Sequence, residues 1–144
     1  MERDDRLLYL TSRAQHRLEA YIKARLKAEG IRVSHTQAGI LLLLEQKGPL
    51  PMSELSRHFE VDNSAITGLV DRLEKAGYAT RSPHPTDRRV NLVSVTEAGA
   101  GEAGRCVGLA KEANEKVKEG FTEDEVDSYR RVLESILEKF RPHG

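Results

Sequence analysis

Residues 61–78 read VDNSAITGLVDRLEKAGY and carry a clear helical signal within the 144-residue chain. Apolar side chains recur there in steps of three and four, which predicts the buried stripe of an amphipathic helix: Ile66, Leu69, Val70 and Leu73. Either Asp62 or Asn63 can cap the N-terminus of this helix, and Gly77 is suited to end it. The stretch therefore predicts a helix over residues 63–77.

A shorter helix is predicted directly before this one, over residues 52–59, with Leu55 and Phe59 on one face. Pro51 stands where a capping Ser or Thr would be preferred, so it either takes that position or begins the helix itself. The acidic turn 60–62 separates the two helices. Two adjacent helices joined by a tight turn are typical of a helix-turn-helix.

Two short strands are predicted after these helices, over residues 78–82 and 90–95. Between them, residues 83–89 read PHPTDRR, which predicts the tip of a hairpin. A β-hairpin that directly follows a helix-turn-helix makes the unit a winged helix. The expected fold is therefore mainly α with a small β-hairpin. Winged helices also serve as scaffolds that bind proteins or RNA, so the fold alone does not fix the function.

The chain before the winged helix is predicted to form an amphipathic helix over residues 4–29, which Gly30 ends. Its apolar positions are Leu7, Leu8, Ala14, Leu18, Tyr21, Ile22 and Leu26. Ser34 and Gln37 have the spacing of a capping box directly before the apolar run 40–44. Because this run is apolar nearly all round, its helix is expected in the middle of the fold.

The chain after the hairpin is predicted to form two helices. Thr96 caps the first, which runs to about Glu119, and a second capping box formed by Thr122 and Glu125 opens the last helix. The apolar stripe of the last helix is expected to point inward: Val126, Tyr129, Val132, Leu133, Ile136, Leu137 and Phe140. Three glycines in the first helix indicate either a close helix crossing or a weak, bent helix: Gly101, Gly104 and Gly108.

The composition excludes several classes of protein. The formal net charge of zero does not by itself indicate a polyanionic partner, although residues 72–92 carry five basic and two acidic side chains. The apolar run 40–44 is far shorter than the roughly 20 residues of a membrane helix. The N-terminus has no apolar stretch like that of a signal peptide, and a single cysteine excludes an intramolecular disulfide framework. We expect a cytoplasmic protein with no membrane contact.

Several short motifs resemble the multiple-antibiotic-resistance regulator (MarR) family. They are SHTQ at residues 34–37, ELS at 54–56, the stretch 61–78, Arg81, PTDRR at 85–89 and VTEAG at 95–99. The resemblance covers about residues 34–99 by motif and the whole chain by the order and length of its helices. Two departures from the family pattern, Pro51 and Val95, do not fall on DNA-contacting positions.

The resemblance implies one MarR-type domain over residues 1–144, with a winged helix-turn-helix at 34–95. Dimerisation helices at 4–29 and 97–141 would interlock two subunits into a homodimer. Such a dimer places two recognition helices about 34–36 Å apart, which is one turn of DNA, so the operator should be pseudo-palindromic. The chain is therefore expected to be a sequence-specific transcriptional regulator of double-stranded DNA, acting as a ligand-responsive repressor.

Contacts with DNA are expected first from the helix over residues 63–77, whose N-terminal side chains can enter the major groove. Burying its apolar stripe turns Ser64, Thr67, Gly68 and Arg72 outward, together with Asp71, whose charge opposes DNA. Two further polar residues are expected either to contact phosphate or to be ordinary surface groups: Gln37 and Ser53.

The resemblance adds contacts from the hairpin tip. The family's Asp-x-Arg pattern matches Asp87 and Arg89, which implies that the carboxylate holds the guanidinium for entry into the minor groove. Arg88 would then touch phosphate at most. The expected DNA-binding residues are Asn63, Ser64, Thr67, Gly68, Arg72, Asp87, Arg88 and Arg89.

Other kinds of site are not expected. Cys106 lies on the packing side of its helix and is interpreted as a buried, inert thiol rather than a redox sensor. The five histidines form no paired metal-ligand spacing; they are His16, His35, His58, His84 and His143. Neither a catalytic site nor a cofactor is expected. The resemblance implies a small aromatic or phenolic acid as effector, with unknown binding residues. The alternatives are an architectural or protein-interaction module without effector control and, more distantly, a small enzyme.

Overall fold

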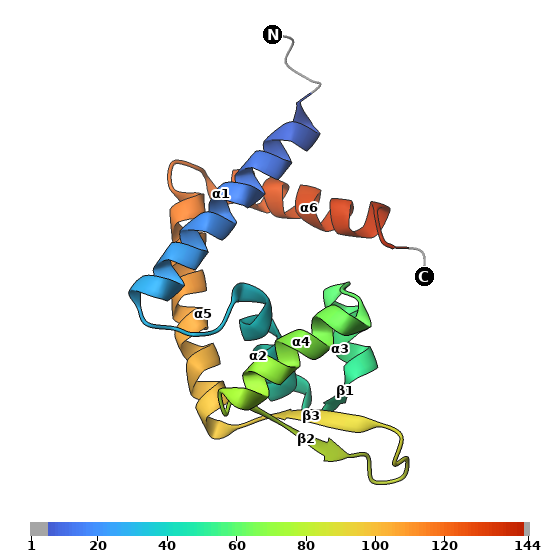
Figure 1. The fold of residues 1–144 in the computed structure, drawn as a ribbon. Helices are drawn as coiled ribbons and strands as arrows, with labels where there is room; N and C mark the ends of the chain where they lie inside the picture. The colour runs from blue at the N-terminus through green and yellow to red at the C-terminus, as the bar shows by residue number, and fades with distance from the viewer. Residues whose placement is uncertain (1–5, 143–144) are drawn as a thin grey trace. The chain divides into compact units, whose positions relative to one another are not determined.

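The structure, a computed structural model, describes residues 6–142. Residues 4 and 5 of the predicted first helix lie outside this range. The chain divides after Ala110 into two compact units, and each is described by itself. The elements follow in the order α1 (Leu7–Ala28), α2 (His35–Lys47), β1 (Leu50–Pro51), α3 (Met52–Phe59), α4 (Asn63–Lys75), β2 (Ala79–Pro83), β3 (Asn91–Val95), α5 (Glu97–Lys118) and α6 (Glu123–Lys139) (Figure 1).

The centre of the first unit is α2, as its apolar sequence predicts. The capping box at its start is confirmed, because Ser34 Oγ accepts from Gln37 N at 3.2 Å and Gln37 Oε1 accepts from Ser34 N at 2.9 Å. One apolar core joins α2 to α3, α4 and β3, and its largest fully buried members are Ile40, Leu41, Leu44, Leu55, Ile66, Val70, Leu73 and Val93. The helix-turn-helix is thus fixed to the sheet through a shared core.

Strand β3 is the middle of a three-stranded antiparallel sheet in the order β1-β3-β2. The β2–β3 hairpin agrees with the sequence prediction, but the two-residue strand β1 is an element that the sequence did not indicate. In β1, Pro51 pairs with Leu92 and has an extended backbone with φ −66° and ψ 154°, so it takes the capping position of α3. Proline is tolerated there because β1 is an edge strand.

The junction between the hairpin and α5 is tightly packed around Thr96. Its Oγ1 donates to Gly77 O at 2.6 Å and accepts from Gly99 N at 3.1 Å, and its N–H donates to Tyr78 O at 3.0 Å. The predicted cap at Thr96 is therefore confirmed. Gly99 lies so close to the preceding chain that a Cβ there would come within 2.1 Å of Tyr78 O.

We expect Gly99→Ala to lower the free energy of unfolding by about 1–3 kcal/mol, because the added methyl group meets backbone that cannot rotate away. The matched control is Gly101→Ala in the same helix, where a Cβ would meet nothing within 4 Å. That control should be neutral or gain up to about 1 kcal/mol from the higher helix propensity of alanine. Urea unfolding of both variants measures the difference, and equal stabilities would contradict the predicted clash.

Three of the four glycines of α5 make no close helix crossing with the described part of the chain, since a Cβ at Gly101, Gly104 or Gly108 would meet no atom within 4 Å. The first half of α1 is also open: Leu7 is 74% and Leu8 85% exposed. Of the apolar positions predicted for this helix, Leu26 is the buried one. None of the helices within residues 6–142 is long and apolar enough to cross a membrane.

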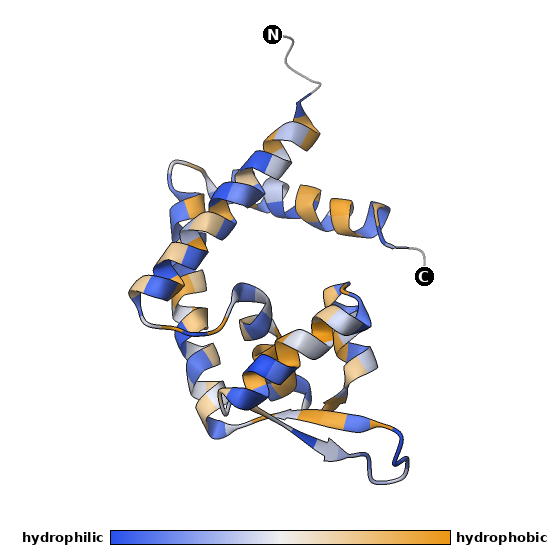
Figure 2. Cartoon of the chain, in the orientation of Figure 1, coloured by the Kyte–Doolittle hydropathy of each residue, from blue (hydrophilic) through white to orange (hydrophobic). Residues whose placement is uncertain are grey.

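The second unit holds the end of α5 and the whole of α6. The predicted capping box is present, because Thr122 Oγ1 accepts from Glu125 N at 3.2 Å and Glu125 Oε1 accepts from Thr122 N at 3.0 Å. The prediction that the apolar stripe of α6 points inward is wrong for the single chain, since no residue of this fully described helix is buried. Figure 2 shows the hydrophobic bands along α6. The most exposed apolar side chains of this segment are Val132 and Leu137 within the helix and Phe140 at its C-cap.

Candidate nucleic-acid interface

Helix α4 has one apolar face in the core and one polar face in solvent. The side chains of the predicted stripe that are fully buried are Ile66, Val70 and Leu73, whereas Leu69 is half-buried. Asp62 is the N-cap, and its carboxylate accepts from Ala65 N at 2.7 Å. This hydrogen bond, with one from the Ser64 hydroxyl, holds the pKa of Asp62 below its usual value.

The two hydroxyl groups on the polar face of α4 are already engaged within the helix. Ser64 Oγ donates to Asp62 Oδ1 at 2.9 Å, and Thr67 Oγ1 donates to the carbonyl oxygen of Asn63 at 2.7 Å. Each oxygen retains lone pairs that can accept hydrogen bonds. In this arrangement Ser64 and Thr67 can accept from a base amino group, but they must rotate before they can donate to phosphate.

Gly68 and Arg72 lie one turn apart on the same face of α4. A Cβ at Gly68 would be 3.9 Å from Arg72 Nη1, which is ordinary contact, so packing inside the chain does not require a glycine at this position. The glycine keeps the helix surface low, and the exposed Arg72 side chain extends over it. This arrangement suits close approach of the backbone to a large polyanion.

An ion pair joins the first wing strand to α4. Arg81 Nη2 of β2 lies 2.5 Å from Asp71 Oδ1, and its Nη1 lies 3.7 Å from Glu74 Oε1. Asp71, expected only to oppose DNA, is therefore neutralised by Arg81. This pair fixes the base of the wing beside α4 and removes a repulsive charge from its polar face.

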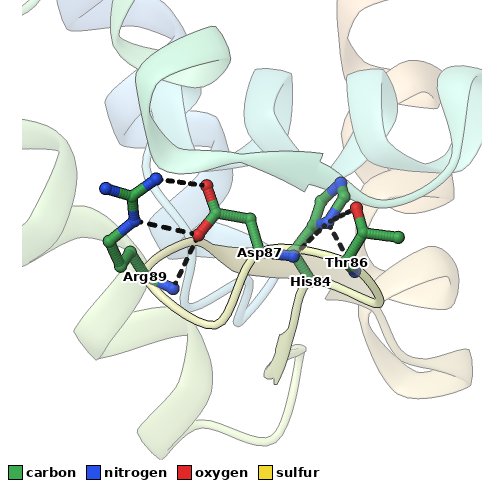
Figure 3. A network of polar contacts seen from close by, with 4 residues as sticks. All are labelled: His84, Thr86, Asp87 and Arg89. Atoms are coloured by element: carbon green, nitrogen blue, oxygen red, sulfur yellow. Dashed lines mark hydrogen bonds and ion pairs between the residues drawn. The ribbon is translucent and has the colours of Figure 1, made fainter.

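The tip of the wing carries a braced arginine (Figure 3). The Asp87 carboxylate accepts from Arg89 Nε at 3.1 Å and from Arg89 N at 3.1 Å through Oδ1, and from Arg89 Nη2 at 3.5 Å through Oδ2. These contacts hold the pKa of Asp87 below its usual value, with the Arg89 side chain as the largest cause. The side chain of Arg89 is still 91% exposed, so its charge faces outward.

Five of the eight predicted contact residues thus lie on α4, at its first position or along its polar surface, and the other three lie at the wing tip. The pairing of Asp87 with Arg89 is the geometry that the Asp-x-Arg spacing predicts, and Arg88 is exposed beside it. The residues on α4 and those at the wing tip are connected through the ion pair of Arg81 with Asp71 and through the shared apolar core. Together they can present two separate cationic points to a polyanion.

The structure contradicts both interpretations of Gln37 made from the sequence, because Gln37 is neither a phosphate contact nor a surface group. The side chain is buried, caps α2, and donates from Nε2 to the carbonyl oxygen of Leu69 at 3.3 Å. Ser53, by contrast, is exposed as a surface polar residue would be. Gln37 therefore ties α2 to α4.

Sequence reasoning missed three residues that position this surface. Arg81 was noted only as part of a motif, although its charge opposite that of Asp71 was a signal for pairing. His84 at the wing tip accepts hydrogen bonds from its neighbours. Tyr78 donates from its hydroxyl to Glu102 Oε2 at 2.7 Å, which raises the pKa of Tyr78 and ties the segment between α4 and β2 to α5. No sequence signal pointed to that contact.

Cys106 agrees with the interpretation as a buried thiol. It is 9% exposed, and burial raises its pKa, which disfavours the reactive thiolate. Among residues 6–142 no cluster of three or more His, Cys, Asp or Glu side chains is placed to hold a metal ion. His143 lies outside the described residues.

Comparison with known proteins agrees with this geometry. The sequence model of the MarR family matches residues 33–90. The chain is 32% identical over 98 residues to the transcriptional repressor IacR of Pseudomonas putida, covering 68% of this chain but only 59% of that protein. It is 30% identical over 100 residues to the regulator MhqR of Bacillus subtilis, covering 69% of this chain and 68% of the relative.

Solved structures of transcriptional regulators resemble this structure over nearly the whole chain, in agreement with the sequence comparison. A probable transcriptional regulator from Pseudomonas aeruginosa superposes with a TM-score of 0.78 at 32% identity, covering 92% of this chain and 98% of that one. A cysteine-to-serine variant of E. coli MarR in complex with operator DNA superposes with a TM-score of 0.75 at 26% identity, covering 92% and 91%. The chain therefore belongs to the MarR family, and the relatives named here are transcriptional regulators rather than enzymes.

Proposed function

We propose that this protein is a ligand-responsive transcriptional repressor that binds a pseudo-palindromic operator as a homodimer. The observation that carries the proposal is the pairing of two surfaces: the polar face of α4, with exposed Arg72, and the wing tip, with Arg89 braced by Asp87. A recognition helix for the major groove and an arginine for the minor groove are complementary to one face of a duplex. The E. coli MarR structure with operator DNA has the same fold.

The homodimer is supported by the open apolar stripe of α6 and by the exposed leucines at the start of α1. Isolated exposed leucines are ordinary, but a stripe repeated along two helices is typical of a surface that another protein covers. A second copy of the chain supplies the same stripe and generates the two-fold symmetry that a pseudo-palindrome requires.

An effector site is supported by a cleft of about 870 Å³ between α1 and the start of α2. Apolar side chains on its wall, among them Ile22, Leu26 and Ile31, lie beside one acidic side chain, Glu19, and three cationic ones, Lys23, Lys27 and Arg32. This volume is within the range of small-molecule sites, and the mixture suits an aromatic or phenolic acid with an apolar ring and one carboxylate. Such a ligand lowers operator affinity only if it binds better to the arrangement that does not bind DNA.

Selection of bound duplexes from a random pool, repeated with aromatic and phenolic acids present, tests the proposal. We expect one pseudo-palindromic sequence to be enriched, with binding that weakens steeply as salt rises because phosphate contacts release counterions. At least one acid should lower affinity for that duplex, and Lys23→Ala with Lys27→Ala should reduce its effect. Salt-dependent but sequence-blind binding would favour an architectural module. Enrichment of a duplex that no acid releases would remove the effector from the proposal.

A further inference from the structure

The loop at the wing tip is closed by two backbone hydrogen bonds. His84 N donates to Val90 O at 2.8 Å, and Val90 N donates to Asp87 O at 3.1 Å. These bonds join the two ends of the loop. Neither of them uses the N–H groups of the residues that lie between His84 and Val90. Two of those N–H groups belong to Thr86 and Asp87, and both point at a side chain (Figure 3).

That side chain is the imidazole of His84. Its Nδ1 accepts from Thr86 N at 3.1 Å and from Asp87 N at 3.2 Å, and Thr86 Oγ1 lies 3.2 Å from the same nitrogen. A side-chain acceptor that binds N–H groups two and three residues ahead stabilises a turn in the way that Asn and Asp do. His84 therefore performs the task of a turn-capping Asn or Asp at the end of β2.

The chain of contacts continues from His84 to the exposed arginine. The Asp87 N–H is bound by His84 Nδ1, and the Asp87 carboxylate binds the backbone and the guanidinium of Arg89. Fixing the backbone at Asp87 restricts the directions in which its carboxylate can point, and so restricts Arg89. Pre-ordering of a flexible side chain reduces the entropy that is lost on binding.

We propose that His84 is a positioning residue for DNA recognition, which caps the wing turn through Nδ1 and thereby holds Asp87 and Arg89 in the orientation that enters the minor groove. The inference rests on the proposed function for the DNA step, but the cap itself is a property of the free protein. Its chemistry is specific: Nδ1 can accept only when it carries no hydrogen, so the neutral ring must hold its proton on Nε2.

Substitutions at His84 separate the acceptor atom from the rest of the ring. In His84→Asn the amide oxygen is attached to Cγ, as Nδ1 is, and can take over both N–H groups. In His84→Gln the amide oxygen is one bond further from the backbone and misses them. We expect His84→Asn to bind the selected duplex within about threefold of the original protein, and His84→Gln and His84→Ala to bind roughly tenfold more weakly, corresponding to about two hydrogen bonds.

A control variant tests the hydroxyl beside the ring. Thr86→Val removes Oγ1 but keeps the backbone N–H that His84 binds, so its affinity for the duplex should change by less than about threefold. Circular dichroism should show that all four variants are folded, since the substitutions lie in a surface loop. A His84→Gln protein that binds as tightly as His84→Asn would overturn the proposal.

A measurement without DNA distinguishes failure of this inference from failure of the proposed function. The long-range ¹⁵N–¹H correlation spectrum of the free protein reports which imidazole nitrogen of His84 carries the proton. We expect the Nε2–H form, and the amide signal of Asp87 should move in His84→Gln but much less in His84→Asn. An Nδ1–H form would overturn the cap. If the cap is present and no duplex is selected, the DNA-binding role of His84 is overturned together with the proposed function.

Discussion

Arg89→Ala is expected to remove most of the affinity for the operator, roughly 10- to 100-fold, together with the preference for A·T pairs at its flanks. A narrow A·T-rich minor groove has a strong negative potential that attracts an inserted arginine, and the loss of a charged contact of this kind is large. Since the Arg89 side chain is 91% exposed, its removal should leave the fold unchanged. Titration of a fluorescent duplex with the variant measures the affinity, with A·T-rich and G·C-rich flanks compared.

Two neighbouring substitutions serve as controls for Arg89→Ala. Asp87→Ala should lose part of the affinity, because the guanidinium remains but is no longer braced through Nε and Nη2. Arg88→Ala should mainly reduce the slope of affinity against salt, as expected for one lost phosphate contact. If Asp87 and Arg89 form only an exposed salt bridge, which solvent screens, both substitutions should change stability slightly and affinity very little. Loss of the flank preference in Arg88→Ala but not in Arg89→Ala would show that Arg88, rather than Arg89, enters the minor groove.

The second large effect is expected at α6. Removal of residues 122–144 should give a protein that is monomeric or aggregated and does not bind the operator, because a single subunit engages only half of the site. Since such a truncation can also disturb folding, Leu137→Glu is the sharper variant. Leu137 is 74% exposed in the single chain, so a charge there costs a monomer little but is strongly unfavourable inside an interface.

Sedimentation equilibrium of Leu137→Glu measures the expected shift from dimer to monomer, and duplex titration measures the accompanying loss of affinity. Arg131→Glu is the matched control, since Arg131 is exposed and lies about 120° away around the same helix. It introduces the same carboxylate on the charged side of α6 and should remain dimeric. A monomeric Leu137→Glu protein that still binds the full operator tightly, or a dimer unaffected by the substitution, would contradict the role assigned to α6.

The order and ends of the helices were predictable from the sequence because their determinants are local. Ser34 with Gln37 and Thr122 with Glu125 form their capping boxes across three residues, where backbone geometry alone places the partners. The pairing of Asp87 with Arg89 spans two residues and followed from the family pattern for the same reason. Two adjacent helices followed by a hairpin then predicted the winged helix, and the matched motifs agreed with it.

The tertiary structure decided the contacts between residues that are far apart in the chain. Gln37 binds the carbonyl oxygen of Leu69, Tyr78 binds Glu102, and Arg81 neutralises Asp71, although nothing local brings these partners together. The position of each depends on how whole elements pack, and a polar side chain has no preferred distant partner until packing supplies one. For this reason Gln37 was assigned to the surface or to phosphate.

The exposure of α6 illustrates the same limit in a different way. The spacing of its apolar residues determined that one face of the helix must be covered, since a stripe of that period is typical of a packed helix. It did not determine whether the covering surface comes from the same chain, because hydrophobic burial is non-directional and has no preference for its partner. The sequence by itself therefore determined the helices, the hairpin and their caps, and the family pattern implied the wing pair. The tertiary structure added strand β1 and decided which polar groups meet and which apolar face remains open.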